Sequence, residues 1–263
     1  DAVVVGSDQL WLPSNIMADY YTLNWVPQDV KKIAYATSFG IGSIPAKYSK
    51  IYSHYLKRIN YLSARETSGQ DIIKKLAGRD VQLVNDPALL LDADGWNEVI
   101  SNEPLIKEKY VFCYFMGNNP EQRNFVRRLA NEKGLKVVAL LHLDQYIATD
   151  EYYVDMAPWH VSPADFVNLV KNAECVCTDS FHGTVFSIIY SRPFFTFKRF
   201  NKKASLSTNT RITSLLTRLG LMDRLVLDMD SKQAFDIDWK KIQSGVSQFR
   251  KVSSEYLLNA IRA

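Results

Sequence analysis

Residues 178–184 (TDSFHGT) hold the side chains of this sequence that are best suited to chemistry. An apolar run ends at Thr178, a polar turn follows, and an apolar stretch with a helical pattern begins at Gly183. We therefore expect His182 near a helix N-terminus, where backbone N–H groups and the helix dipole favour phosphate or carboxylate. Imidazole titrates near neutral pH, so His182 is a candidate general acid or base. A histidine that caps the helix or fills a gap is the alternative.

Polar side chains also follow other predicted strands, at the point where each strand ends. Asp8 follows the strand at 2–5, Arg65 follows 61–64, and Lys198 follows 194–197. Active sites of α/β proteins collect at such strand ends, so this clustering indicates an enzyme. Fixed cations there suit a phosphate or a carboxylate, and arginine can bind either group bidentately. The alternatives are surface ion pairs of Arg65 and an ordinary basic loop at Lys198 and Arg199, which we favour for Arg199.

These polar residues would lie at one edge only if the strands form a parallel sheet. The sequence predicts such a sheet, because short apolar runs alternate with helical stretches. Strands are expected at 2–5, 32–37, 61–64, 81–84, 110–115, 136–141, 174–178 and 194–197. Helices are expected at 45–58, 67–76, 121–133, 163–172, 183–190, 211–219 and, as one or two helices, 239–261. Asn209 is then an N-cap, or close to one, of the helix that begins at Arg211.

The pattern breaks in the polar, turn-rich stretch 91–109, which predicts two domains, at 1–105 and 106–263. We expect both to be doubly wound and to face each other, with a ligand outside the carboxyl ends of the strands. The helices of 239–263 are expected to pack back on the first domain. The chain begins at Asp1, directly before an apolar strand, so the first domain is expected to be truncated.

Composition excludes several classes of protein. The 263 residues are 47% hydrophobic and 23% charged, as in a folded globular chain. A net charge of +4 is too small to call for nucleic acid. No apolar run of about 18 residues or secretory signal is present. The three cysteines are expected to be buried free thiols. The histidines lack the spacing of metal ligands. The tryptophans are scattered along the chain, which fits a core better than a sugar platform.

Several segments together resemble the polysaccharide pyruvyl transferases. They are VVVGSDQLW, IAYATSFG, LSARE, VNDPALLLD, and TDSFHGTVFSIIYSRPFFTFKR followed by NTRITSLLTRLGL. The resemblance implies a GT-B-like fold and a pyruvyl group passed from phosphoenolpyruvate to a sugar as a ketal. It implies a functional histidine at His182 and donor-binding cations at Arg65 and Lys198.

The reaction so implied requires a clamp for two anionic groups, a proton relay and a base, and no metal or cofactor. His182 suits the relay, and Asp8 or Asp179 could take the proton of the sugar hydroxyl. Ser180, Gly183, Asn209 and Arg211 complete the expected substrate-binding set.

The expected partners are phosphoenolpyruvate and a glycan acceptor, free or lipid-linked. The chain would then work in the cytoplasm, including the inner face of the membrane. A GT-B glycosyltransferase with a nucleotide-sugar donor and a non-catalytic glycan-binding module are the competing hypotheses.

Overall fold

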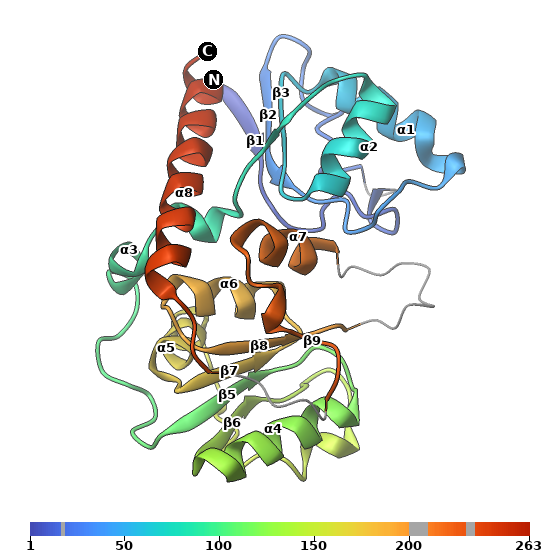
Figure 1. The fold of residues 1–263 in the computed structure, drawn as a ribbon. Coiled ribbons are helices and arrows are strands. Elements are labelled where there is room, and N and C mark those ends of the chain that lie inside the picture. Colours follow the sequence, from blue (N-terminus) through green and yellow to red (C-terminus); the bar gives the residue numbers. More distant parts are fainter. Residues whose placement is uncertain (17–18, 200–209, 230–234) are drawn as a thin grey trace. The chain divides into compact units, whose positions relative to one another are not determined.

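The computed structural model describes residues 1–16, 19–199, 210–229 and 235–263, so Asn209 lies outside the described part. The chain forms two compact units, each built on a parallel sheet (Figure 1). The first unit comprises the described residues of Asp1–Leu90, Lys202–Leu215 and Gly245–Ala263. The second comprises those of Leu91–Asn201 and Leu216–Ser244. The prediction of an α/β chain with two parallel sheets is confirmed.

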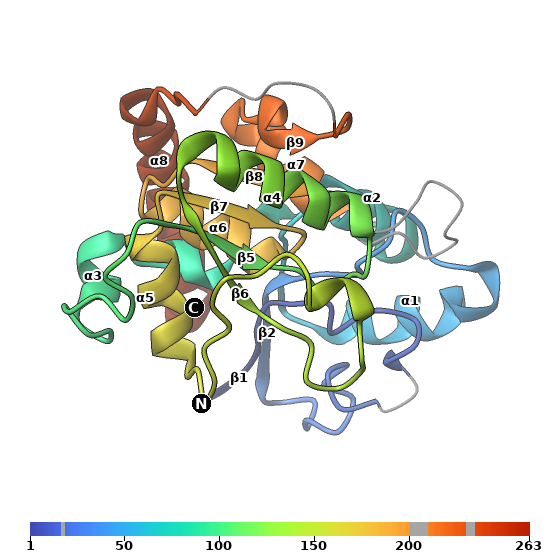
Figure 2. The same ribbon diagram turned by 90° about the horizontal axis from the view of Figure 1, so that it is seen from below.

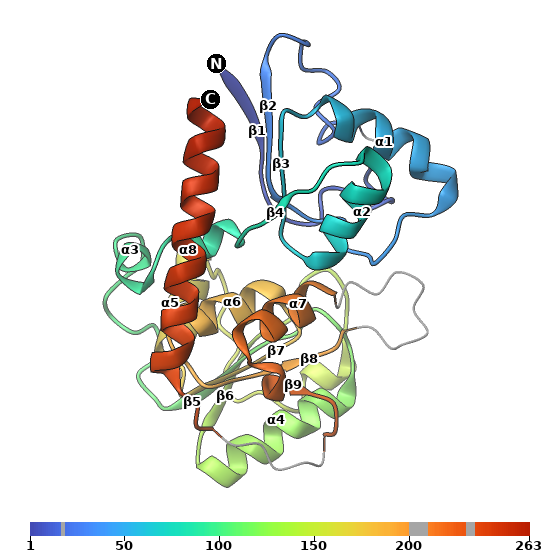
Figure 3. The ribbon, with the colours of Figure 1, turned by 45° about the horizontal axis from the view of Figure 1, so that its top comes forward.

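The first sheet contains, within the described residues, four parallel strands in the order β1-β2-β3-β4. The strands are β1 (Ala2–Val5), β2 (Lys31–Thr37), β3 (Tyr61–Ala64) and β4 (Gln82–Leu83). On one face lie η2 (Ala46–Tyr48), α1 (Ser49–Arg58) and α2 (Thr67–Ala77), and Tyr55 and Ile73 share a core with Ala34 there. Tyr35 clusters on the other face with Tyr256 of α8 (Trp239–Arg262). Figure 3 shows the C-terminal part of α8 running alongside β1. The short helix η3 (Pro87–Leu90) follows β4.

Strand β2 carries a β-bulge near its carboxyl end. The register against β3 shifts between Ala34 and Thr37, and Ala36 has a φ of 55°, which is rare for a residue other than glycine. The Ser63 hydroxyl of β3 compensates for the interrupted ladder, because it donates to the Ala34 carbonyl and accepts from the Ala36 N–H, each at 3.0 Å. Beyond the bulge, the Thr37 hydroxyl donates to the Gly6 carbonyl at 3.0 Å. The bulge thus joins the carboxyl ends of β1 and β2.

Replacing Ser63 with alanine should destabilise the first unit, because a buried carbonyl and a buried N–H would both lose their partner. We expect the free energy of unfolding to fall by about 1–3 kcal/mol, measured by urea denaturation. Ser43→Ala, at an exposed position, is the matched control and should leave stability unchanged. Equal stability of the two variants would show that the Ser63 hydroxyl does not support the bulge.

The second sheet has, among the described residues, five parallel strands in the order β6-β5-β7-β8-β9. The strands are β5 (Tyr110–Tyr114), β6 (Lys136–Leu140), β7 (Cys175–Thr178), β8 (Phe194–Phe197) and β9 (Leu225–Val226). The order reverses at β5, so the carboxyl ends of β5 and β7 form a topological switch point, where doubly wound folds bind ligands. In the first sheet the described strands follow one another without such a reversal.

Helices cover both faces of the second sheet (Figure 2). They include α3 (Ala93–Asn97), α4 (Pro120–Lys133), η4 (Ala148–Asp150), α5 (Pro163–Asn172), α6 (Phe181–Ile189) and η5 (Met222–Arg224). Helix α7 (Thr210–Leu219) belongs to the first unit up to Leu215. Phe125 of α4 packs with Cys113 and Cys177 on one face. Phe166 of α5 stands edge-on to Phe112 on the other, with ring centroids 5.8 Å apart.

The structure corrects some sequence-based expectations. Helix α6 begins at Phe181 rather than Gly183, because the Ser180 side chain caps it by accepting from the Gly183 N–H at 3.3 Å. The division between the units falls after Leu90 instead of at 105, and the stretch expected to be irregular contains α3. The terminal helical region forms a single helix, whose residues from Gly245 onward belong to the first unit.

The tryptophans divide between core and surface. Trp11 is fully buried, as expected of a core residue, but Trp25 and Trp159 are mostly exposed, so the expectation that the tryptophans fit a core does not hold for these two. The three cysteines are buried free thiols, as predicted. None of the described helices combines the length and the apolar character needed to cross a bilayer.

Candidate functional site

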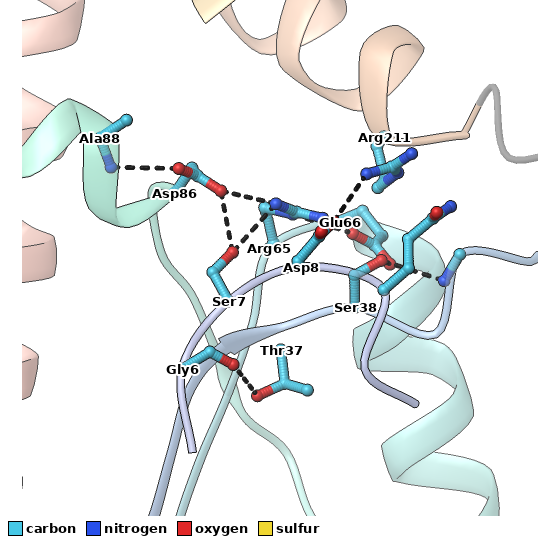
Figure 4. A network of polar contacts seen from close by, with 12 residues as sticks. Gly6, Ser7, Asp8, Thr37, Ser38, Arg65, Glu66, Asp86, Ala88 and Arg211 are labelled. Carbon is cyan, nitrogen blue, oxygen red and sulfur yellow. Dashed lines mark hydrogen bonds and ion pairs between the residues drawn. The ribbon is translucent and has the colours of Figure 1, made fainter. Parts of the chain in front are cut away.

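Two groups of polar side chains stand at strand ends, one in each unit. The first cluster draws on the carboxyl ends of all four strands of its sheet and on α7 (Figure 4). It consists of Ser7, Asp8, Ser38, Arg65, Glu66, Asp86 and Arg211. The second cluster follows β7 and β8 and consists of Asp179, Ser180, His182, Gly183, Lys198 and Arg199.

Arg65 is the centre of the first cluster. Its side chain is 2% exposed, and the guanidinium donates to the Asp86 carboxylate and, at 2.9 Å, to the Ser7 hydroxyl. The Asp8 and Glu66 carboxyl groups lie 3.6 and 3.9 Å from other guanidinium nitrogens. The Ser7 hydroxyl also donates to Asp86 at 2.8 Å, which closes the network. Arg65 is therefore enclosed by carboxyl groups, and an anionic ligand would have to displace them.

Asp8 is the exposed member of the first cluster. Its side chain is 57% exposed, and its carboxylate lies 3.2 Å from a guanidinium nitrogen of Arg211 as well as beside Arg65. Its φ of 91° is strained for an aspartate, and such strain collects at functional positions. The structure thus brings together Asp8, Arg65 and Arg211, three of the residues selected from the sequence.

Glu66 is the buried acid of the first cluster. Its carboxyl group accepts from the Ser38 hydroxyl at 2.6 Å, and its side chain is almost inaccessible to water. Burial raises the pKa of Glu66 above its usual value, and the guanidinium of Arg65 and the Ser38 hydroxyl oppose the shift only in part.

The raised pKa of Glu66 predicts a pH-dependent stability. A carboxyl group whose pKa is higher in the folded state contributes fully below its unfolded pKa of about 4.3, and loses that contribution as pH rises through the folded pKa. We therefore expect the Glu66→Gln variant, compared with the wild type, to gain relative stability between pH 4.5 and pH 8 in urea denaturation. A relative loss over the same window would mean that Glu66 is better stabilised as the carboxylate.

Asp179 organises the second cluster at the switch point. Its two carboxylate oxygens accept from the backbone N–H groups of Met116 and Gly117, at 2.8 and 2.9 Å, in the loop that follows β5. The Nε of Arg199 lies 3.7 Å from the same carboxylate, which is fully buried. A Cβ on Gly117 would stand 2.9 Å from the Asp179 oxygen, so the loop approaches closely because residue 117 is glycine.

The start of α6 is fixed by Thr178. The Thr178 hydroxyl donates to the Tyr114 carbonyl at 2.6 Å and accepts from the Ser180 N–H at 3.0 Å. A Cβ on Gly183 would meet the Thr178 Oγ1 at 2.6 Å, so only glycine allows α6 to lie this close to β7. His182 follows in the first turn of α6 and is half-buried. The expected place of His182 at a helix N-terminus is confirmed.

The two cations after β8 differ in their surroundings. Arg199 donates from its guanidinium to the Asp179 carbonyl at 3.3 Å, in addition to lying near the Asp179 carboxylate. Lys198 is half-buried, and its own carbonyl accepts from the Gln122 side chain at 3.1 Å. The sequence favoured Lys198 and treated Arg199 as part of a basic loop, because the partner of Arg199 follows a different strand.

A third polar group, in the second unit, includes His142, which follows the predicted strand at 136–141. The Asp150 carboxylate accepts from Nε and Nη2 of Arg123, at 3.0 and 2.8 Å, and lies 2.8 Å from Nδ1 of His142. These side chains are buried, and the arginine packs over the rings of Phe115 and Tyr153. The local sequence marks only His142, as a polar residue after a strand; Arg123 and Asp150 could not be selected, because they come from separate elements.

Replacing Asp179 with asparagine should disturb the switch point. An asparagine retains one acceptor, but its NH₂ group would face a backbone N–H that now donates to a carboxylate. We expect the free energy of unfolding to fall by about 1–3 kcal/mol in urea denaturation. Asp144→Asn, at an exposed site, is the control; an unchanged stability of Asp179→Asn would contradict the role assigned to the carboxylate.

Comparison with solved structures shows that the fold is GT-B-like. The chain is similar to a putative UDP-N-acetylglucosamine 2-epimerase from Listeria monocytogenes, with a TM-score of 0.56, 12% identity, and coverage of 100% of this chain and 74% of that chain. The UDP-GlcNAc 2-epimerase of Methanocaldococcus jannaschii gives a TM-score of 0.52 at 14% identity, with coverage of 94% of this chain and 69% of that chain. The UDP-GlcNAc 2-epimerase of Neisseria meningitidis gives a TM-score of 0.51 at 12% identity, with coverage of 99% of this chain and 70% of that chain. At these identities the likeness concerns the fold alone.

The sequence comparison is more specific. The family model for polysaccharide pyruvyl transferase matches residues 1–199, which include Asp8, Arg65, Asp179, His182 and Lys198. The chain therefore belongs to the polysaccharide pyruvyl transferase family and is a transferase enzyme. A search of curated proteins found no match.

Proposed function

We propose that this enzyme transfers a pyruvyl group from phosphoenolpyruvate to a pair of sugar hydroxyls of a polysaccharide or its precursor, forming a cyclic ketal and releasing phosphate. The observation that carries the proposal is that His182 lies in the first turn of α6, at the switch point, within the part of the chain that matches the family. A helix N-terminus favours an anionic ligand, and phosphoenolpyruvate has two anionic groups.

The second cluster supplies the donor side of the proposal. Lys198 and Arg199 are cations at the carboxyl end of β8, next in the sheet to the strand that leads into α6. Lys198 binds an anionic group of the donor, and the positive end of the α6 dipole favours the phosphate and the carboxylate nearby. Fixed positive charge of this kind stabilises the negative charge that develops on the departing phosphate.

His182 acts as the proton carrier. Protonation of the methylene carbon of phosphoenolpyruvate makes C2 electrophilic, and a sugar hydroxyl then adds to C2 and gives up its proton. The C2–O bond to phosphate breaks, phosphate leaves with the bonding electron pair, and the second hydroxyl adds to C2 and loses its proton. Each step needs an acid or a base near neutral pH, which an imidazole provides.

Asp8 and Asp179, the two candidates for the base, differ in how far their side chains are buried. Asp179 is buried and already accepts two backbone hydrogen bonds, so its role is to hold the loop after β5. Asp8 is exposed and sits in a strained conformation, so it can accept a hydrogen bond from a sugar hydroxyl. We propose that Asp8 contacts a hydroxyl of the acceptor in the first unit, where Arg65 and Arg211 position its carboxylate.

The test is a measurement of phosphate release by the full chain from phosphoenolpyruvate, with a panel of glycan acceptors. His182→Ala should reduce kcat by about 10²- to 10⁴-fold, the range typical of lost acid–base catalysis. His54→Ala replaces an exposed histidine of α1 and should keep the wild-type rate.

Two outcomes would overturn the proposal. A full rate in His182→Ala would exclude its role as proton carrier. Release of a nucleoside diphosphate from a nucleotide-sugar, with none of phosphate from phosphoenolpyruvate, would instead support glycosyl transfer.

A further inference from the structure

The loop between β1 and β2 presents three aromatic side chains to solvent. Tyr20 is 63% exposed, Trp25 is 57% exposed and Tyr21 is 39% exposed. We propose that this aromatic platform (Tyr20, Tyr21 and Trp25) binds sugar rings of an extended glycan acceptor. The acceptor part of this inference rests on the proposed function, whereas glycan binding itself does not.

The platform is held rigidly from beneath. Arg58 of α1 donates to the Asn24 carbonyl and side-chain oxygen, both at 3.0 Å, and to the Val26 carbonyl at 3.2 Å. The buried indole of Trp11 donates to the Tyr21 carbonyl at 2.9 Å. Thr22, Leu23 and Val26 point into the unit and are buried. The backbone that carries the exposed rings is thus anchored before a ligand arrives, which reduces the entropy lost on binding.

The rings are ordered relative to one another. The Trp25 indole donates to the Tyr20 carbonyl at 2.8 Å, and the Tyr20 and Trp25 rings stack with centroids 5.9 Å apart and planes inclined by 22°. Tyr21 stands edge-on to Tyr20, with centroids 5.1 Å apart. Because its N–H is already engaged within the loop, Trp25 offers mainly its apolar ring surface. Such surface suits the C–H face of a sugar ring.

Charge argues for a glycan and against an anionic bilayer. The first thirty residues contain four aspartates and no lysine or arginine, whereas a membrane-binding surface needs basic residues. Asp19 and Asn24, which are joined by a hydrogen bond of 2.8 Å, lie next to the rings in sequence. A carboxylate and an amide provide the acceptors and donors that sugar hydroxyls require.

The anchoring of the platform indicates a long acceptor. Arg58 holds the loop at the end of α1, just before β3 begins, and Lys32, at the start of β2, binds the Pro27 carbonyl. Asp8 lies at the opposite end of the strands, since it bridges to Thr37 at the end of β2. Seven residues of strand span roughly 20 Å. A glycan that reaches both Asp8 and the platform must therefore contain several sugars, and a monosaccharide would not suffice.

The experiment measures binding of the full chain to immobilised hexose and N-acetylhexosamine oligosaccharides of one to six sugars, without phosphoenolpyruvate. We expect affinity to increase with length, and Trp25→Ala or Tyr20→Ala to weaken it about two- to tenfold, the worth of one aromatic contact. Trp25→Phe should retain most of the binding. Trp159→Ala removes a tryptophan that is 73% exposed in the second unit and should bind as the wild type does.

Several results would overturn the inference. They are the absence of length-dependent glycan binding, wild-type affinity in folded Trp25→Ala, and binding to phosphatidylcholine–phosphatidylglycerol vesicles that Trp25→Ala abolishes. The last result would make the platform a membrane contact. Because the assay omits the donor, a failure of pyruvyl transfer would leave glycan binding intact, and the two proposals can fail separately.

Discussion

The buried guanidinium of Arg65 is the group on which the carboxyl edge of the first sheet depends. Removing a charge from water costs several kcal/mol unless partners replace the water, and here they come from the residues after β1, β3 and β4. One cation therefore fixes where three strand ends lie. It also orients Asp8, whose carboxylate lies between Arg65 and Arg211. The requirement to pair a buried charge thus places an exposed carboxylate.

In the second unit a buried negative charge, rather than a positive one, holds the strand ends together. Its buried ion is the Asp179 carboxylate, and its partners are two backbone N–H groups after β5 and the side chain of Arg199. The strand order reverses at this place, so the carboxylate joins the loops on the two sides of the switch point. The first turn of α6, with His182, follows directly from the loop that Asp179 belongs to. The position of the histidine is therefore a consequence of a buried ion.

Sequence reasoning located these edges because apolar runs and their polar ends are local signals. The strands at β1, β3 and β8 and the capped start of α5 at Ser162 follow from such patterns. The bulge at Ala36 could not be predicted, since it depends on a hydroxyl from another strand. The two-residue strand β9 is too short for a periodic signal. The partners that enclose Arg65 are far apart in the sequence. The sequence therefore indicated that Arg65 lies at a strand end, but not that carboxyl groups surround it.

Burial decides what a polar residue at a strand end can do. Asp8 and Asp179 both follow a strand, and neither composition nor spacing separates them. A carboxylate that accepts two amide hydrogen bonds in a dry site would leave them unpaired if it turned to a substrate, at a cost of about 1–3 kcal/mol for each. The Asp8 carboxylate lies near Arg65 and Arg211 but is 57% exposed, so it can accept from a hydroxyl in place of water without leaving a buried N–H unpaired. The same comparison applies to the cations, because Arg65 is enclosed whereas Lys198 is half-buried. In each unit the more accessible polar side chains at the strand ends are therefore the better candidates for contact with a substrate, and the buried ones determine where those side chains stand.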